Sequence, residues 1–513
     1  MDITKEKFEF TKIKKNKSKF EKLLKFLVRN RDLDENLYLA NKLLTFATYN
    51  NCGYFESNIL ENFYCDLAKT IDGKAKINKF EKNNILHVMT TSCKVGGHTR
   101  VVEKWINLAP CYQKHSVALL DQEGEIPEKL KNNINNKNGE LYIFNKDDDI
   151  FQKAIKLREL ASKFEYVVLH IHMDDPTALV AFGSEEFSRP ILFFNHADHL
   201  FWVGKSVSDI VLDFRTIKSI TKTKRNIENP YFLGIPPETE EKYIEQYDKN
   251  ETRKKLSLPL DKKIILTIGS NFKYTPFKNK NFVDFATKIL EKEKDAILYA
   301  IGPSLNDEMW KIANEKLEGR IIPLGTINYG EEYFNYIKSS DLILDSWPMC
   351  GGTVIMDAIS LAKPILSLDN EIGQLDYVLK SKSFAKNEDE FIEKAILILN
   401  DSNIANEYIS DLKNNYIKEN DPKLWQERLK KLEEIIPCKH STKRNQEPEN
   451  VIIDDYVLSL NMFEKNNSTT QKLNKSTVFY LYKFLAYKYL IKNSKKRNIY
   501  FKLFIDSILK QYS

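Results

Sequence analysis

The sequence predicts an α/β protein with two doubly wound, Rossmann-like domains that face a cleft, and with helical extensions at both ends. Two separate stretches alternate apolar, strand-like runs with amphipathic helical segments, over about 84–214 and 263–435. In each stretch a glycine pair separates a strand from a helix, Gly96-Gly97 in the first and Gly351-Gly352 in the second. A proline-bounded segment from Asn229-Pro230 to Pro236-Pro237 joins the stretches.

Composition places the chain among ordinary globular proteins. Its 513 residues are enough for about three domains. Hydrophobic residues make up 42% and charged residues 29%, which excludes a disordered chain. The formal net charge of +6 is small for this length, so we expect no nucleic-acid partner. The six cysteines show no CxxC spacing, which indicates reduced thiols and no structural zinc site.

No signal for secretion or membrane insertion is visible in the sequence. The opening residues Met1–Lys7 are polar and no apolar segment follows them. No run approaches the roughly 18 uninterrupted apolar residues that a membrane-spanning helix needs. We therefore expect a cytoplasmic protein.

Residues 1–80 are predicted to form a helical accessory region. Leucines recur mostly at steps of three and four residues between lysines, as in Leu23, Leu24 and Leu27, and again in Leu39 and Leu43. The region offers no chemical motif, so we expect it to pack on the rest of the chain.

Residues 81–230 are predicted to form the first Rossmann-like domain. Strands are expected at 85–89, 116–120, 141–144, 165–172, 190–195 and 210–214, with helices between them. Ligands bind at the carboxyl ends of such strands. The polar residues predicted to lie at these ends are His98, Arg100, His172, Asp174, His196, Asp198 and His199.

Residues 231–437 are predicted to form the second domain. A polar helix is expected over 238–255, strands at 263–269, 296–301, 321–324, 342–344 and 364–367, and helices at 282–292, 310–317, 333–339, 353–362 and 389–399. A last helix over 423–435 closes this domain in our interpretation. Two similar domains joined by a linker imply a ligand-binding cleft between them.

The segment from Leu342 to Pro364 is the strongest chemical signal. A strand, the turn Pro348-Met-Cys-Gly-Gly352 and a helix opening near Thr353 present free backbone N–H groups and the positive end of a helix dipole. Asp357, one turn into the helix, is placed to accept hydrogen bonds from a ribose. The pattern predicts a sugar-nucleotide site, although an ordinary glycine turn used for packing would read the same in isolation.

Residues 438–513 are predicted to be a linker followed by a basic, aromatic helical tail. The segments 477–492 and 498–510 are rich in tyrosine, phenylalanine and lysine. Packing on the body of the protein accounts for such helices. The alternative is peripheral contact with the anionic inner face of the membrane, or with a partner protein.

With these segments in place, the chain resembles a GT-B glycosyltransferase over residues 84–435. The first half is similar to family 4, with the loop Gly96-Gly97-His98-Thr-Arg100, a strand ending His170-Ile-His172, and the next strand ending at His196. The resemblance implies that Gly96, Gly97 and Arg100 form an acceptor or phosphate loop.

The second half is more similar to the group of O-GlcNAc transferases and bacterial cytoplasmic protein N-glycosyltransferases. Ser270-Asn-Phe, Phe277-Lys278 and the segment from Pro348 through Met356-Asp357 match that group's motifs. The resemblance implies that Lys278 contacts the diphosphate, Thr353 caps it and Asp357 holds the ribose, with Asn271, Gly351 and Gly352 completing the site. Met349 and Asp357 replace the two glutamates of family 4, so the signature of a retaining enzyme is broken.

We expect the donor to be a UDP sugar, and transfer from a nucleotide sugar requires stabilisation of the charge that develops on the departing diphosphate. Lys278, Arg100 and the helix at Thr353 provide it, and no Asp-x-Asp clamp stands near the turn, so we expect an enzyme that uses neither metal nor cofactor. A hydroxyl acceptor would lose its proton to a base. The base candidates, in order, are His196, His98, Asp198 and His172.

Three functions remain open from the sequence. The second-half motifs favour sugar transfer to a protein or peptide. The basic tail and the resemblance of the first half to family 4 favour transfer to a lipid-linked or surface glycan. Loss of the paired glutamates leaves a non-catalytic GT-B scaffold as the third.

Overall fold

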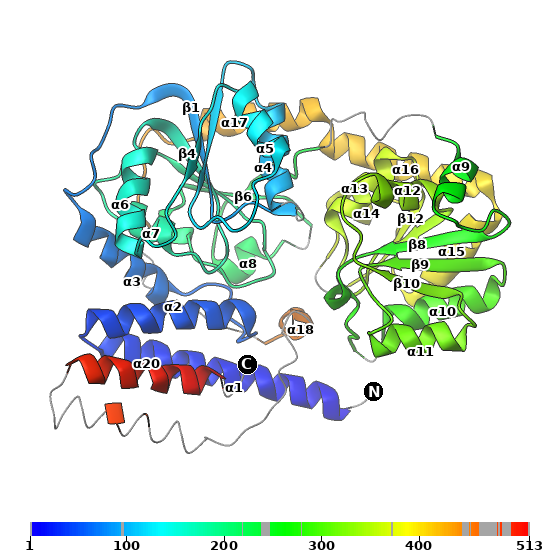
Figure 1. Cartoon of the computed structure of the whole chain (residues 1–513), viewed down its shortest axis with the longest axis horizontal. Helices are drawn as coiled ribbons and strands as arrows, with labels where there is room; N and C mark the ends of the chain where they lie inside the picture. The colour runs from blue at the N-terminus through cyan, green and yellow to red at the C-terminus, as the bar shows by residue number, and fades with distance from the viewer. Residues whose placement is uncertain are drawn as a thin grey trace.

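The computed structural model describes residues 3–93, 97–217, 219–237, 247–278, 280–370, 373–443, 451, 453–460, 480, 483–484 and 494–510. Within these residues two parallel sheets form two α/β lobes, and a layer of helices lies along one side of the first lobe (Figure 1). The alternating pattern of the sequence thus produces the predicted pair of Rossmann-like domains.

The first lobe is built on a seven-stranded parallel sheet of order β3-β2-β1-β4-β5-β6-β7. Its strands are β1 Glu81–Met89, β2 Lys114–Leu119, β3 Leu141–Ile143, β4 Phe164–His170, β5 Ile191–Phe194, β6 Ile210–Asp213 and β7 Tyr231–Phe232. Its helices are α4 Gly97–Leu108, α5 Glu128–Asn136, α6 Ile150–Ala161, α7 Thr177–Phe182 and α8 Thr221–Arg225. Because successive side chains point to opposite faces, the central strands bury apolar residues on both sides.

The second lobe is built on a six-stranded parallel sheet of order β10-β9-β8-β11-β12-β13. Its strands are β8 Lys263–Ile268, β9 Ala296–Ile301, β10 Ile321–Gly325, β11 Leu342–Leu344, β12 Ile365–Leu368 and β13 Phe384–Ala385. Its helices are α9 Lys249–Lys255, α10 Phe282–Lys292, α11 Glu308–Lys316, α12 Glu331–Ser339, α13 Gly352–Ser360, α14 Asp376–Leu379, α15 Glu388–Asn400 and α16 Ser402–Asn420. Part of the predicted 238–255 helix lies outside the described residues; the described part is α9.

The N-terminal helices share one core with the first lobe. They are α1 Ile3–Arg29, α2 Leu33–Tyr49 and α3 Asn58–Ala68. Asp32 caps α2 through a hydrogen bond from the Glu35 N–H, which satisfies a donor that the helix leaves free. Leu39, Leu43 and Leu60 belong to the same buried cluster as the residues on one face of the first sheet. The helical region is therefore an extension of this lobe.

Helix α17, Pro422–Ile435, corrects the domain assignment made from the sequence. From its sequence position this helix is expected to close the second domain. In the structure Trp425, Leu429 and Leu432 are buried with Trp105 of α4 on the first sheet. Figure 1 shows α17 crossing from the second lobe onto the first. The apolar stripe of a helix shows that it is buried, but not against which sheet.

The tail is described mainly by α18, Asp455–Ser459, and α20, Ser494–Lys510. Phe501, Ile505 and Leu509 of α20 are buried in the core cluster of the first lobe, and Tyr38 of α2 donates a 2.6 Å hydrogen bond to Asp506. Packing on the body, one of the two predictions, is confirmed for α20. Most of the segment 477–492 lies outside the described residues. None of the helices in the described ranges has the length and apolar character that crossing a bilayer requires.

Candidate functional site

The turn between β11 and α13 has the open helix N-terminus that the sequence predicts. Helix α13 starts at Gly352, one residue before Thr353, and no side chain caps it. A Cβ atom built on Gly352 meets nothing within 4 Å. The first N–H groups of α13, together with the positive end of its dipole, can therefore receive an anion.

Asp345 at the end of β11 holds this turn in place. Its Oδ1 accepts a 2.8 Å hydrogen bond from the Gly351 N–H, and its Oδ2 accepts a 2.6 Å bond from the Ser367 hydroxyl. Burial raises the pKa of Asp345 to about 6, although these two donors and Lys273 oppose the shift. The amino-acid sequence alone does not identify this carboxyl, because any acidic residue at a strand end would give the same pattern.

Lys273 contacts this turn. Its ammonium donates a 3.2 Å hydrogen bond to the Cys350 carbonyl. Lys278, which the resemblance selected, is exposed and lies over the Phe277 ring, with its ammonium 5.4 Å from the ring centroid. Asn271 is also exposed and donates a 2.7 Å hydrogen bond to Asp307. The segment after β8 therefore brings a lysine to the turn, five residues before the predicted one.

Asp357 meets the first lobe through Arg100. One Arg100 guanidinium nitrogen lies 3.3 Å from Asp357 Oδ1, and the guanidinium stacks on the Tyr329 ring at 4.1 Å from its centroid. Tyr333 donates a 3.0 Å hydrogen bond to the other Asp357 oxygen. Burial raises the pKa of Asp357 while Arg100 and Lys104 lower it. This contact places the N-terminal end of α4 opposite α13.

Three of the predicted base candidates lie together at the carboxyl edge of the first sheet. The rings of His98 and His196 are 3.8 Å apart between centroids, and those of His98 and His172 are 5.6 Å apart. Burial lowers the pKa of His196 well below its usual value, and the neighbouring histidines add to this. Burial also lowers the pKa of His98 to about 3. Both rings are therefore neutral near pH 7, and each has one ring nitrogen with a lone pair.

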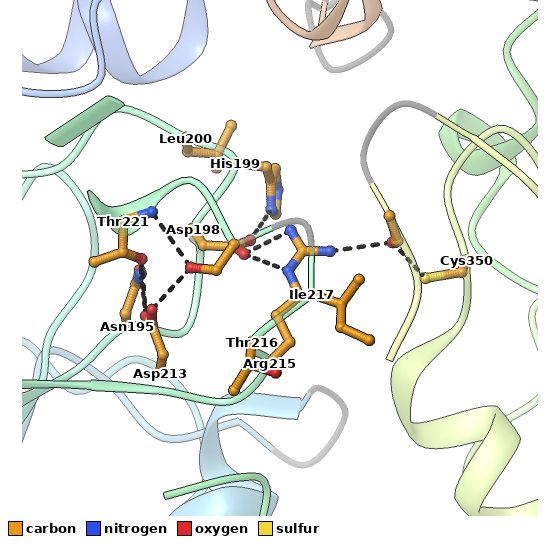
Figure 2. A network of polar contacts seen from close by, with 12 residues as sticks. Asn195, Asp198, His199, Leu200, Asp213, Arg215, Thr216, Ile217, Thr221 and Cys350 are labelled. Carbon is orange, nitrogen blue, oxygen red and sulfur yellow. Dashed lines mark hydrogen bonds and ion pairs between the residues drawn. The ribbon is translucent and has the colours of Figure 1, made fainter. Parts of the chain in front are cut away.

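Asp198 is not placed as a base. Figure 2 shows its carboxylate against the Arg215 guanidinium, with a 2.6 Å hydrogen bond from Nε, and His199 beside it. Burial alone would raise the pKa of Asp198, but Arg215 and His199 lower it to about 2. A carboxylate with so low a pKa has little tendency to take a proton, so its contacts describe a structural ion pair.

The same network joins the two lobes. Arg215 also donates a 3.1 Å hydrogen bond to the Gly373 carbonyl, which accepts a second bond from the Cys350 thiol (Figure 2). Asp376 at the start of α14 accepts hydrogen bonds from the backbone N–H groups of Thr216 and Ile217. Burial raises the pKa of Cys350 to about 12, so this thiol is a protonated donor.

Of the predicted glycine loop, Gly96 lies outside the described residues, and Gly97 is the exposed first residue of α4. Within the described ranges, no group of three or more His, Cys, Asp or Glu side chains is arranged to hold a metal ion. The structure thus assembles two groups of predicted residues, the histidines on the first lobe and the α13 turn with Asp357 on the second.

No protein-family model matches the chain, and no curated protein sequence matches it. Solved structures do. An O-GlcNAc transferase mutant from Thermobaculum terrenum superposes with a TM-score of 0.53 at 12% identity, over 82% of this chain and 81% of that one. HepE from Anabaena, in complex with UDP and glucose, gives 0.51 at 12% identity, over 68% and 99%. At identities this low, the superpositions establish the fold alone. The chain has the GT-B fold.

Proposed function

We propose that this protein is a glycosyltransferase that moves a sugar from a UDP sugar to an acceptor. The observation that carries the proposal is the open N-terminus of α13, followed by Asp357, facing α4 of the other lobe within a GT-B fold. The similar HepE structures contain UDP with glucose, and UDP-glucose. A UDP diphosphate at Gly352 and Thr353 would be stabilised by the helix N–H groups.

In this proposal the second lobe holds the donor. Lys273, which contacts the Cys350 carbonyl, neutralises charge on the diphosphate, and Lys278 reaches the diphosphate from the loop after β8. Asp357 accepts hydrogen bonds from the ribose, which requires its contact with Arg100 to open. Arg100, so released, becomes available to the phosphates. The developing charge on the diphosphate is thereby met by lysine, arginine and backbone donors, so we propose that transfer is independent of metal ions.

The first lobe handles the acceptor in this proposal. As the bond between the sugar C1 and the diphosphate oxygen breaks, the acceptor oxygen forms a new bond to C1, and its proton passes to a neutral imidazole. His196 is the first choice because it is neutral near pH 7 and lies at the carboxyl edge of the sheet; the His98 ring packs against it at a tilt. His172 lies at the same edge of the sheet, near His98.

We propose a protein or peptide side chain as the acceptor. Helix α2 borders the acceptor edge, where Thr45 donates a 3.2 Å hydrogen bond to Asp174. An extended acceptor could therefore contact both the sheet edge and the helical extension. This choice also leads us to propose a cytoplasmic location. A lipid-linked glycan acceptor is the competing proposal, and it needs the tail to bind lipid.

The proposal is tested by incubating the full chain with a panel of UDP sugars and measuring UDP release. We expect slow release from one sugar or a few, and none from the Gly352→Asp variant. Mass spectrometry of peptides incubated with the active donor should then show the mass of one sugar added. Release from no donor, with no heat of binding for any nucleoside diphosphate, would leave a non-catalytic scaffold.

A further inference from the structure

A ladder of four histidines crosses the first sheet beneath α4 and α17. It consists of His115 of β2, His87 of β1, His170 of β4 and His196 after β5. Three hydrogen bonds link these rings, His115 Nδ1 to His87 Nε2 at 2.9 Å, His87 Nδ1 to His170 Nε2 at 3.1 Å, and His170 Nδ1 to His196 Nε2 at 2.9 Å. Among eight histidines in the whole sequence, four are used here.

The strand register explains the ladder. His115 pairs with Ile85, and His87 lies two residues further along β1 on the same face. His87 in turn pairs with Val168, and His170 lies two residues further along β4. Each step therefore moves one strand across and two residues forward, so the ladder runs diagonally to the carboxyl edge, where His196 meets His98.

The ladder rings are neutral. His87 and His115 are fully buried and His170 is 1% exposed, so none of these three can be solvated as a cation. Burial lowers the pKa of His87 to about 3, and that of His115 well below its usual value, with Lys137 adding to the effect on His115. A neutral imidazole has one ring N–H and one ring nitrogen with a lone pair.

Counting hydrogens then fixes the direction of the ladder. Four neutral rings have four ring hydrogens, and the three bonds between rings use three of them. The fourth must lie at one end, either on His115 Nε2 or on His196 Nδ1. At the first end, His115 Nε2 faces the Gln113 Oε1 at 3.2 Å, and a carbonyl oxygen can only accept.

The orientation of Gln113 is itself set by a carboxylate. The Gln113 amide nitrogen donates a 2.5 Å hydrogen bond to Glu433 of α17, which also accepts one from the Tyr166 hydroxyl. Burial raises the pKa of Glu433, and the hydrogen bonds from Gln113 and Tyr166 oppose this shift by stabilising the carboxylate. A carboxylate requires donors, so the amide NH2 faces Glu433 and its oxygen faces His115. The fourth hydrogen is then on His115 Nε2.

We propose that this ladder is a positioning device which holds His196 as its Nε2–H tautomer, so that His196 Nδ1 has a lone pair ready to accept the acceptor's proton. Gln113, at the opposite end of the ladder, thus controls a nitrogen in the candidate site. The tautomer of His196 is a property of the protein alone, while its role as proton acceptor rests on the proposed function.

The decisive variant is Gln113→Lys. An ammonium beside Glu433 donates to His115 Nε2, so the fourth hydrogen is forced to the other end and every ring changes tautomer. His87→Phe cuts the ladder and removes the constraint on His196. His440→Gln is the matched control, because His440 is buried in the same lobe but hydrogen-bonds to Asp209, outside the ladder.

The measurement is 15N NMR of the full chain labelled at histidine, because protonated and unprotonated ring nitrogens give well separated signals. We expect the His196 Nε2–H tautomer in the wild type and in His440→Gln, and Nδ1–H in Gln113→Lys. A wild-type His196 with Nδ1–H, or a His196 signal that Gln113→Lys leaves unchanged, would overturn the proposal. His87→Phe should give a mixture of tautomers, and a single tautomer there would equally count against it.

A second readout uses UDP release from the active UDP sugar. Loss of the accepting nitrogen should lower kcat roughly tenfold or more in Gln113→Lys, with the Kd for UDP unchanged. Unchanged kcat with inverted tautomers would overturn the role as proton acceptor. If wild-type protein binds no UDP, the proposed function fails, and the NMR result still decides whether the ladder sets the tautomer.

Discussion

At the scale of single residues, the site combines positions that the sequence identifies with others that only the fold reveals. Gly352, Thr353 and Asp357 could be selected because a strand, a glycine turn and a helix form a recognisable pattern. Asp345 and Lys273 could not be selected from the sequence, because their roles depend on tertiary contacts. The buried Asp345 carboxyl accepts a hydrogen bond from the Gly351 N–H, and the loop after β8 brings Lys273 to the Cys350 carbonyl. His87 and His115 were equally hidden, because their alignment depends on strand register.

Asp345 should make stability depend on pH. Its pKa is raised from 3.8 to about 6, so its contribution is fully present below the unfolded pKa and is lost as pH rises through about 6. The loss amounts to about 3 kcal/mol of unfolding free energy, at roughly 1.4 kcal/mol per pKa unit. Denaturant unfolding of wild type and Asp345→Asn at about pH 4 and about pH 7 measures it. A difference between the two proteins that does not change with pH would contradict this assignment.

Lys278 and its neighbour Lys280 test the predicted diphosphate contact. Both are exposed. Lys278 lies in the turn that the bridge between Phe277 and Lys280 closes, and Lys280 ends that turn. Lys278→Ala should weaken UDP binding roughly tenfold, as loss of one charge-assisted contact does, and Lys280→Ala should leave it unchanged. Isothermal titration calorimetry with UDP compares them. Equal affinities for both variants would remove Lys278 from the site and leave Lys273 as the lysine of the turn.

At the scale of elements, periodicity predicted most strands and helices of both sheets, including α10 at its exact bounds. It missed α16, a 19-residue helix whose apolar positions are few and whose buried residues are Tyr408, Leu412 and Asn420. It also assigned α17 to the wrong sheet. Amphipathic periodicity reports that one side of a helix is buried, whereas the choice of partner depends on tertiary packing.

Helix α17 should therefore stabilise the first lobe. Trp425 is fully buried, with its ring 5.6 Å from that of Trp105 between centroids. Trp425→Ala should lower the free energy of unfolding by about 3–5 kcal/mol, because it leaves a large cavity. Ile435→Ala on the same helix is the control, since Ile435 is 56% exposed and should change stability by less than about 0.5 kcal/mol. Hydrogen exchange should show faster exchange in β1 and β4 of Trp425→Ala, and protection lost only in the second lobe would contradict the packing.

At the scale of the whole molecule, polar contacts between described residues join the two GT-B lobes. Arg100 reaches Asp357, Arg215 reaches the Gly373 carbonyl, and Asp376 accepts from the backbone at Thr216. The sequence predicted two facing lobes because it contains two strand–glycine–helix units joined by a proline-bounded linker. It could not predict these contacts, since they depend on how the lobes are oriented.

The central claim, that a nucleotide diphosphate binds at the N-terminus of α13, is tested most directly by titrating UDP into Gly352→Asp and Gly330→Asp. Both glycines lie at helix N-termini of the second lobe and have open space where a side chain would go, so neither variant should lose stability. We predict that wild type and Gly330→Asp bind UDP with equal affinity and that Gly352→Asp binds it at least about tenfold more weakly, because its carboxylate repels the phosphates. UDP binding that is the same in all three proteins, or absent from wild type, would contradict the claim.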